Sequence, residues 1–563
     1  MILKTRNKHP WINFVSALSS VLKKSYWAVS LIAISTLSSA STVNAAENIS
    51  VTFGILEASI RVSSLETFAK DGTISRDLEL FLGATSLEEQ LQLREALTKP
   101  VKVSPVYLSR FFNTDMGERI LTQIGSIMNL QSGLNGKLGI RSALVASAFE
   151  PEGFTLLGFL QKFPTNIRLR GELILRLSDI VSQVVSATTI VSQTLEELTL
   201  AETKSNPPID FSKLPDLRKE GEFGVQPKQI WILTDASRNR KFYVDVYRPM
   251  RSPSKPIAVL ILSHGLGSRP EDFDIRAKHW ASYGYVVALP QHIGSDFRQI
   301  QSLRDGLSNQ LFDANDFIDR PKDISYVIDE LARRNNSEFQ GKLNLESVGV
   351  AGHSFGAYTA FAVAGAEIDF DNLEKDCGRE LLNLNLSLIL QCQALTLPRQ
   401  KYTFRDPRVG AILATNPLGS SIFGRKGLSM IQIPVMTIGG SYDPAAPAVF
   451  EQIQAFPWFT TPNKYLALVE GQAHINFSKL DPRIRHTINS LADLTLPSSS
   501  LIDNYANGIS IAFFGTFSQK EKNFAPYLQS AYAIYLSQGE KFKLSLITSA
   551  SAERLIEVIS AFK

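Results

Sequence analysis

Cysteine is scarce in this 563-residue chain, which has only Cys377 and Cys392, and neither belongs to a CxxC pair. Cysteines and histidines do not cluster at metal-ligand spacing, so the sequence predicts no metal site. A long basic run is also missing beyond the first 24 residues, and 58 basic against 54 acidic residues leave a net charge of +4. This balance lacks the electrostatic footprint of a nucleic-acid-binding protein, and we exclude that class.

The composition is otherwise that of a folded globular protein, with 44% hydrophobic and 20% charged residues. The chain is too long for one ordinary domain, so we expect two or three. Internal repeats and low-complexity segments are absent after residue 46.

The first 46 residues differ from the rest of the chain. Basic residues precede an apolar stretch, "YWAVSLIAISTL", which serines interrupt and which is shorter than the roughly 20 residues that span a bilayer. Small residues follow, and Val43 and Ala45 fit the positions before a cleavage point. We expect a signal peptide over residues 1–45, cleaved near Ala45, and export to the bacterial periplasm or beyond. An uncleaved membrane anchor is the alternative.

Export bears on the two cysteines. An oxidising compartment permits a disulfide between Cys377 and Cys392, and we expect one. Two buried thiols are the alternative.

Residues 47–200 are expected to form a mainly helical N-terminal domain. Serine precedes glutamate by three positions at Ser63 with Glu66 and at Ser86 with Glu89, a pattern that predicts two helix starts. Further helices are predicted over residues 105–128, 139–148 and 167–198. No constellation of His, Asp, Ser or Cys in this domain suits catalysis, so we interpret it as a scaffold or cap.

A polar, proline-rich linker over residues 201–227 leads into a second domain, residues 228–563. Apolar runs such as "KPIAVLILSHG", "ESVGVAGHS" and "IPVMTIGGS" alternate there with helical segments. Runs rich in Val, Ile, Leu and Ala indicate strands covered on both faces. The domain is therefore predicted to be α/β, a mostly parallel sheet flanked by helices. Active groups in such sheets gather at the carboxyl ends of the strands.

The stretch "GHSFG" places Ser354 between one of these strands and the next helix. G-x-S-x-G at a strand-to-helix turn is typical of a nucleophile elbow, in which a sharp turn exposes the serine hydroxyl. Five residues alone are weak support, because a purely structural turn reads the same way.

A serine nucleophile needs a histidine base and a carboxylate that orients the base. His474 follows a strand among small and polar residues, whereas His486, the other histidine after Ser354, lies in a charged stretch. Asp443 follows the strand "VMTIGGS" at its carboxyl end, although an Asp-Pro turn would look similar. Asp406 lies at the amino end of its strand. We predict Ser354, Asp443 and His474 as the triad.

Attack on a carbonyl also requires two N–H donors for the oxyanion. We assign these to the backbone of Phe355, directly after the serine, and of Leu266 in the turn "SHGLGS". His264 and His353 are interpreted as structural residues.

These motifs resemble the alpha/beta hydrolase superfamily, within it the platelet-activating-factor acetylhydrolase-like and dienelactone hydrolase-like branch. "SHGLGS", "GHSFGAYTA" and "GQAHINF" carry the resemblance, over about residues 229–477. The resemblance implies hydrolysis of short or oxidised acyl esters without metal or organic cofactor. Some acetylhydrolases take their acid from the preceding strand, which here ends "LATNP" without a carboxylate. Residues 47 to about 200 resemble the domain of unknown function found in cyanobacterial alpha/beta hydrolases.

An insertion over residues 367–407 separates the serine helix from the next strand and carries both cysteines. It is expected to form either a cap over the pocket or a surface excursion.

We therefore predict an exported serine esterase or lipase-like enzyme that cleaves carboxylic esters through an acyl-enzyme on Ser354, in a lipid-degrading role. Its expected partner is a small ester or lipid, with peripheral membrane contact. Three alternatives stay open: an amidase or peptidase, an acyltransferase, and a non-catalytic envelope binding protein.

Overall fold

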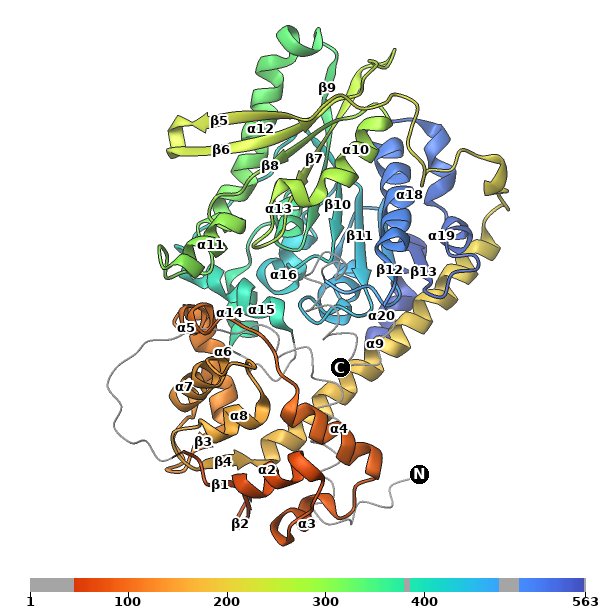
Figure 1. Ribbon diagram of the computed structural model, residues 1–563. Helices are drawn as coiled ribbons and strands as arrows, with labels where there is room; N and C mark the ends of the chain where they lie inside the picture. The colour runs from red at the N-terminus through yellow and green to blue at the C-terminus, as the bar shows by residue number, and fades with distance from the viewer. Residues whose placement is uncertain (1–44, 379–384, 475–495, 561–563) are drawn as a thin grey trace.

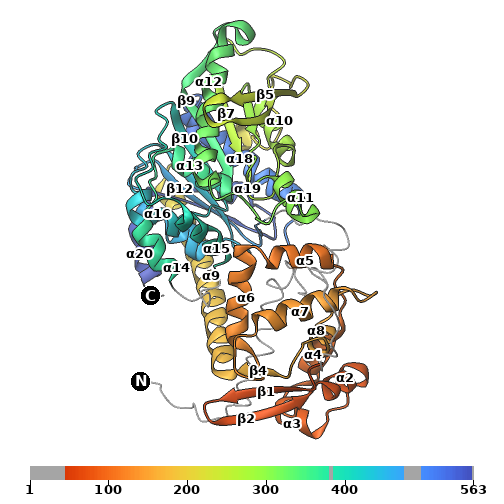
Figure 2. The same cartoon turned by 90° about the vertical axis from the view of Figure 1, so that its left-hand side faces the viewer.

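The computed structural model describes residues 45–378, 385–474 and 496–560. They form a smaller N-terminal unit and a larger α/β unit, joined by one long helix (Figure 1). Turned by 90°, the molecule is elongated, with the N-terminal unit at one end (Figure 2).

The N-terminal unit combines a small sheet with a group of helices. Its four strands are ordered β2-β1-β4-β3, with bounds β1 (Asn48–Phe53), β2 (Leu56–Arg61), β3 (Met128–Leu130) and β4 (Ile167–Arg170). Its helices are α2 (Val62–Asp71), α3 (Arg76–Leu82), α4 (Leu87–Thr98), α5 (Pro105–Phe112), α6 (Asp115–Ile127), α7 (Lys137–Ala148) and α8 (Leu156–Gln161).

One of the two predicted helix starts is confirmed and the other is wrong. Ser86 caps α4 by accepting from the Glu89 N–H, while the Glu89 carboxylate accepts from the Ser86 N–H. Ser63, in contrast, lies inside α2, which begins at Val62. The Asp77 carboxylate from the next helix accepts the Arg61 N–H at 2.9 Å, so a tertiary contact replaces the expected local cap.

Two predicted helical spans also differ from the structure. The span 105–128 is broken at Asn113, where Thr114 caps a new helix by accepting from the Gly117 N–H. The span 167–198 begins as strand β4 and continues as α9 (Gly171–Ser205), which runs into the expected linker. In length and composition α9 alone among the described helices could span a membrane, but Val191 and Leu195 are fully buried against the α/β unit.

The α/β unit is built on a nine-stranded sheet, ordered β13-β12-β11-β10-β9-β7-β8-β6-β5. The six strands from β12 to β8 are parallel. Strands β13 and β6 flank them in antiparallel orientation, and β5 pairs antiparallel with β6. Their bounds are β5 (Gln229–Asp235), β6 (Arg240–Tyr247), β7 (Ile257–Ser263), β8 (Val286–Pro290), β9 (Leu343–His353), β10 (Val409–Thr415), β11 (Val435–Gly440), β12 (Lys464–Val469) and β13 (Leu544–Thr548). The expected mostly parallel α/β sheet is present.

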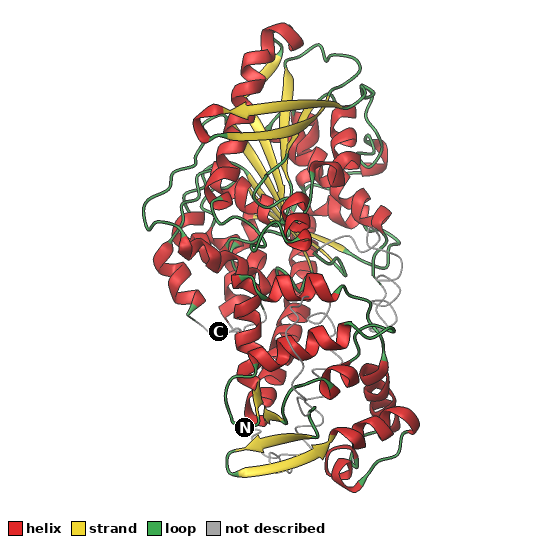
Figure 3. Ribbon diagram, turned by 60° about the vertical axis from the view of Figure 1, so that its left-hand side comes forward, coloured by secondary structure: helices red, strands yellow, loops and turns green. Residues whose placement is uncertain are grey.

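Helices cover both faces of this sheet (Figure 3). Val259 and Ile261 of β7 pack toward α12 (Asp316–Phe339), α13 (Phe355–Val363) and α16 (Ser420–Leu428). Leu260 and Leu262 pack toward α10 (Asp274–Ser282), α18 (Ser499–Phe517) and α19 (Ser530–Leu536). Alternate residues of one strand thus enter two separate cores. The other α-helices of the described residues in this unit are α11 (Phe297–Asp305), α14 (Phe370–Cys377), α15 (Leu386–Cys392) and α20 (Ala552–Ser560).

Helix α9 ties the two units together along the edge strand β13 (Figure 1). The Thr199 hydroxyl donates to the Leu546 carbonyl and accepts the Leu546 N–H, which satisfies backbone groups that an edge strand leaves open. The buried Glu202 carboxylate accepts from the Thr548 N–H and from the hydroxyls of Ser530 and Ser551. The helix that joins the two units is therefore hydrogen-bonded to the sheet itself.

The insertion is anchored to the α/β unit. A disulfide joins Cys377 of α14 to Cys392 of α15, as expected for an oxidising compartment. The buried Glu451 carboxylate accepts from Ser387 and Gln391 of α15 and from the Ser420 N–H of α16. Charge-assisted bonds of this kind fix α15 in place.

Replacing Glu202 with alanine should lower the unfolding free energy by about 2 to 3 kcal/mol, because buried donors lose a charged acceptor. Thermal or urea unfolding measures this loss. Glu197→Ala, on the exposed side of the same helix, is the matched control and should change stability little. Equal stability of the two variants would contradict the assigned role of α9.

Candidate active site

Ser354 sits at a sharp turn between β9 and α13, with φ 57° and ψ −117°. A Cβ added at Gly352 would lie 2.0 Å from the carbonyl oxygen of Gly356, and a Cβ added at Gly356 would lie 1.9 Å from the carbonyl oxygen of Ser263. Only glycine fits at both positions, because backbone atoms fill the space. The left-handed conformation of a serine costs on the order of 1–3 kcal/mol and is typical of functional sites.

The structure brings the three predicted triad residues together at the carboxyl edge of the sheet. The Ser354 hydroxyl lies 2.8 Å from His474 Nε2, and His474 Nδ1 lies 2.7 Å from Asp443 Oδ2. Ser354 follows β9, Asp443 follows β11 and His474 follows β12. This chain of hydrogen bonds can move a proton from the serine oxygen to the imidazole.

Asp443 is held by a set of donors that the sequence did not reveal. Its Oδ1 accepts the N–H groups of Ala445 and Ala446 at 2.9 and 2.8 Å, and its Oδ2 accepts Asn416 Nδ2 at 2.6 Å. Asn416 itself accepts from Gln472 at 3.1 Å. These bonds aim the carboxylate at His474. Asn416 directly follows β10, at the strand end where the sequence lacks a carboxylate, and this position was the signal that could have identified it.

Two other histidines lie near the site, His353 and His264, and their contacts agree with the structural role expected of them. His353 lies 2.8 Å from the His474 carbonyl through Nε2, which steadies the histidine loop. His264 is buried, and burial foremost holds its pKa well below the ordinary value. His486 lies outside the described residues.

The two proposed oxyanion donors belong to segments next to Ser354, one that follows it in the chain and one that packs against it. Phe355 is the first residue of α13, so its N–H has no acceptor within the helix. Leu266 lies in the turn after β7; the neighbouring Gly267 N–H is bonded to a carbonyl, whereas the Leu266 N–H has no acceptor among the described residues. A Cβ at Gly265 would lie 3.3 Å from the Ser354 Cβ, which brings this turn against the serine.

A cavity of about 590 Å³ opens beside Ser354 and His474. It extends between the sheet and helices α10 and α18, and its apolar wall includes Leu262, Trp280, Leu413, Ile438, Ile502 and Ile509. Arg276 also lines it, but its guanidinium is paired with Asp503 at 3.0 Å. No residue of the described part of the insertion lines this cavity, so that part does not form a cap over it.

Comparison with known families bears on the N-terminal unit. Residues 45–169 match the model of a family described as "Alpha/beta hydrolase of unknown function (DUF1400)". The match supports a hydrolase of the alpha/beta class. It covers neither Ser354 nor the nine-stranded sheet. No curated protein matches the chain. Among the described residues, no group of three or more His, Cys, Asp or Glu could hold a metal ion.

Asp443→Asn should lower the turnover of an activated ester such as 4-nitrophenyl acetate by about three to four orders of magnitude, because the imidazolium loses its counter-charge. The control is Asp406→Asn, in which a buried carboxylate paired with Arg408 on the same unit is neutralised. That change should lower stability and spare turnover. Retention of most turnover in the Asp443 variant would show that the acid is misassigned.

Proposed function

We propose that the protein is a serine hydrolase that cleaves carboxylic esters through an acyl-enzyme on Ser354. The observation that carries this proposal is the hydrogen-bonded series Ser354–His474–Asp443, opening into an apolar cavity. The family match supports the coarser statement that the protein is an alpha/beta hydrolase. We propose the alpha/beta-hydrolase fold for the larger unit, whose motifs resemble the acetylhydrolase-like and dienelactone hydrolase-like branch.

Acylation follows from the geometry. His474 Nε2 takes the hydroxyl proton as the Ser354 oxygen attacks the ester carbonyl, and Asp443 stabilises the imidazolium that forms. The N–H groups of Phe355 and Leu266 donate to the oxyanion of the tetrahedral intermediate. The intermediate collapses when the alkoxide leaves with the proton from His474, and the acyl group remains on Ser354.

Deacylation repeats these steps with water. His474 removes a proton from a water molecule as its oxygen attacks the acyl carbonyl, and the proton then returns to the Ser354 oxygen as the acid leaves. None of these steps draws on a metal or an organic cofactor.

The apolar lining of the cavity favours binding of the acyl chain of an ester. Arg276, the one arginine among the described lining residues, is paired with Asp503 and donates to Asn507 at 2.6 Å, so the described wall offers more aliphatic and aromatic surface than unpaired charge. An apolar wall stabilises an acyl chain through the hydrophobic effect, by about 0.8 kcal/mol for each buried methylene. We therefore propose lipid-like esters as substrates, reached at the surface of a membrane.

The same triad would serve an amidase, a peptidase or an acyltransferase, and an envelope binding protein could retain it without turnover. The apolar cavity favours esters of fatty acids over peptides, whose backbone would require hydrogen-bonding partners along the wall. We also propose that the protein is exported. The expected signal peptide lies outside the described residues, and the Cys377–Cys392 disulfide supports an oxidising compartment.

Hydrolysis of 4-nitrophenyl esters from acetate to palmitate by protein lacking residues 1–45 tests the proposal. We expect kcat/KM to rise about fourfold for each added methylene until the cavity is full. Ser354→Ala should abolish hydrolysis while the fold is kept. Absence of ester hydrolysis by the wild-type protein, together with hydrolysis of amides, would favour the peptidase alternative.

The position of the acyl chain can be tested separately. Ile509→Trp places a larger side chain in the cavity wall and should shift the preference to shorter chains, with acetate hydrolysis largely kept. Ile556→Trp, at an exposed position of α20, is the matched control and should keep the wild-type preference. An unchanged preference in the Ile509 variant would show that the chain binds elsewhere.

A further inference from the structure

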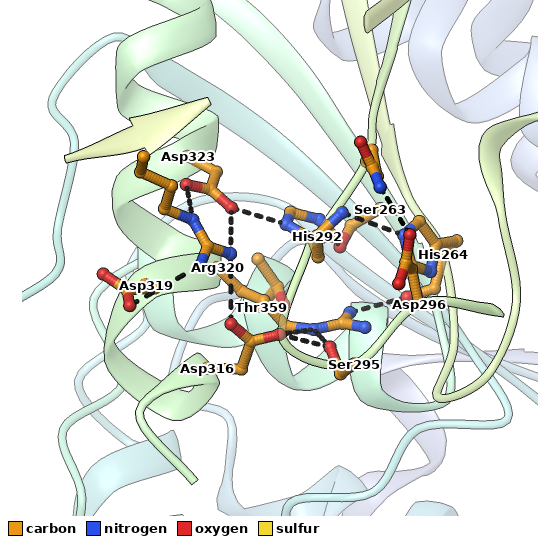
Figure 4. A network of polar contacts seen from close by, with 12 residues as sticks. Ser263, His264, His292, Ser295, Asp296, Asp316, Asp319, Arg320, Asp323 and Thr359 are labelled. Atoms are coloured by element: carbon orange, nitrogen blue, oxygen red, sulfur yellow. Dashed lines mark hydrogen bonds and ion pairs between the residues drawn. The ribbon is translucent and has the colours of Figure 1, made fainter. Parts of the chain in front are cut away.

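The α/β unit contains a second Ser–His–Asp series, formed by Ser263, His292 and Asp323 (Figure 4). The Ser263 hydroxyl is 2.9 Å from His292 Nε2, and His292 Nδ1 is 2.9 Å from Asp323 Oδ2. By residue type and distance these three resemble a catalytic triad. Their side chains come from the ends of β7 and β8 and from α12.

Burial separates this series from the catalytic one. Ser263, His292 and Asp323 are all fully buried, and none of them lines the cavity beside Ser354. Burial, and next the positive charge of nearby arginines, holds the pKa of His292 well below its ordinary value. A substrate therefore has no access to the Ser263 oxygen, and the series holds parts of the fold together.

The series belongs to a larger network that ends on the oxyanion turn. Arg320 of α12 is fully buried and donates to the His264 carbonyl at 2.6 Å and to the Gly265 carbonyl at 3.4 Å (Figure 4). Its Nε donates to the Ser295 hydroxyl at 2.8 Å. Burial lowers the pKa of Arg320 to about 10, so the guanidinium stays charged at neutral pH. Its centre lies 4.3 Å from the Phe355 ring, next to the other donor.

His264 and His292 also hold this turn in place. His264 Nε2 accepts the His292 backbone N–H at 3.1 Å, and His264 Nδ1 lies 2.8 Å from the Gly265 carbonyl. The Gly265 carbonyl thus receives donors from both His264 and Arg320. Two polar side chains fix the orientation of one peptide plane.

In a trans peptide the C=O and N–H groups point in opposite directions. A Gly265 carbonyl directed at Arg320 therefore turns the N–H of the same peptide, that of Leu266, away from Arg320. We infer that Arg320 is a positioning residue that orients the Leu266 N–H toward the oxyanion of the intermediate formed on Ser354. This inference rests on the proposed function.

The arrangement of N–H donors on the guanidinium explains why position 320 holds an arginine and not a lysine. One guanidinium reaches two carbonyls and a hydroxyl at once, in a fixed plane, whereas a lysine ammonium is a point charge with a flexible stem. The charge is balanced by Asp316, whose Oδ2 lies 3.7 Å from Arg320 Nε. Lysine would keep this charge while losing the paired carbonyl bonds.

Arg320→Lys is therefore the primary test, with kcat and KM measured on a 4-nitrophenyl ester. We expect kcat to fall about 10- to 100-fold with KM within about twofold, somewhat less than loss of a complete oxyanion donor. A trifluoromethyl ketone, which forms a tetrahedral adduct on serine, should lose affinity by the same factor as kcat/KM. Arg333→Lys, at the exposed end of the same helix, is the matched control and should behave as wild type.

Ser295→Ala is the second variant, because it removes only the hydroxyl that steers Arg320 Nε. It should lower kcat about threefold to tenfold, and it decides the question if the lysine variant does not fold. Wild-type kcat and ketone affinity in a folded variant, even with lowered thermal stability, would overturn the inference. Failure of the wild-type protein to hydrolyse any ester or bind the ketone would instead contradict the proposed function.

Discussion

The left-handed backbone of Ser354 is the constraint on which the rest of the site depends. This conformation is possible because Gly352 and Gly356 have no Cβ, so neighbouring backbone atoms approach them more closely than a side chain would allow. The strain of this turn is held by the parallel strands on either side, whose ladders fix β9 between β7 and β10. Because neighbouring parallel strands end at one edge, the same packing brings Asp443 and His474 to the serine.

The two Ser–His–Asp series of the α/β unit show that residue type alone does not determine whether a serine is accessible to a substrate. The series that ends on Ser354 opens into an apolar cavity, and the one that ends on Ser263 is sealed in the core. The sealed series and Arg320 support the turn that carries Leu266, to which we assign one oxyanion donor. Under the proposed function, this network would hold the donor in place before a substrate binds, and such preorganisation is a major source of electrostatic catalysis in enzymes.

Much of this site could be predicted because its signals are local. The "GHSFG" turn, and an Asp and a His directly after strands, follow from strand-end reasoning applied to single stretches. Asn416 and Arg320 were missed because their partners are distant in sequence and their roles depend on which carbonyl or carboxylate they meet. The failed cap at Ser63 has the same cause, since Asp77 supplies the bond from another helix. Helix α9 is longer than predicted because its last turns are stabilised against β13.

Mapping the covalent adduct of a fluorophosphonate by mass spectrometry shows which serine of the protein is the nucleophile. The reagent forms a stable bond only with a serine whose hydroxyl is activated by a base. The other serines of the protein, buried and exposed, carry the same hydroxyl group and serve as internal comparisons. We expect one adduct, on the peptide that contains Ser354, and none on the peptide that contains Ser263. An adduct on another serine, or a folded protein that remains unlabelled, would contradict it.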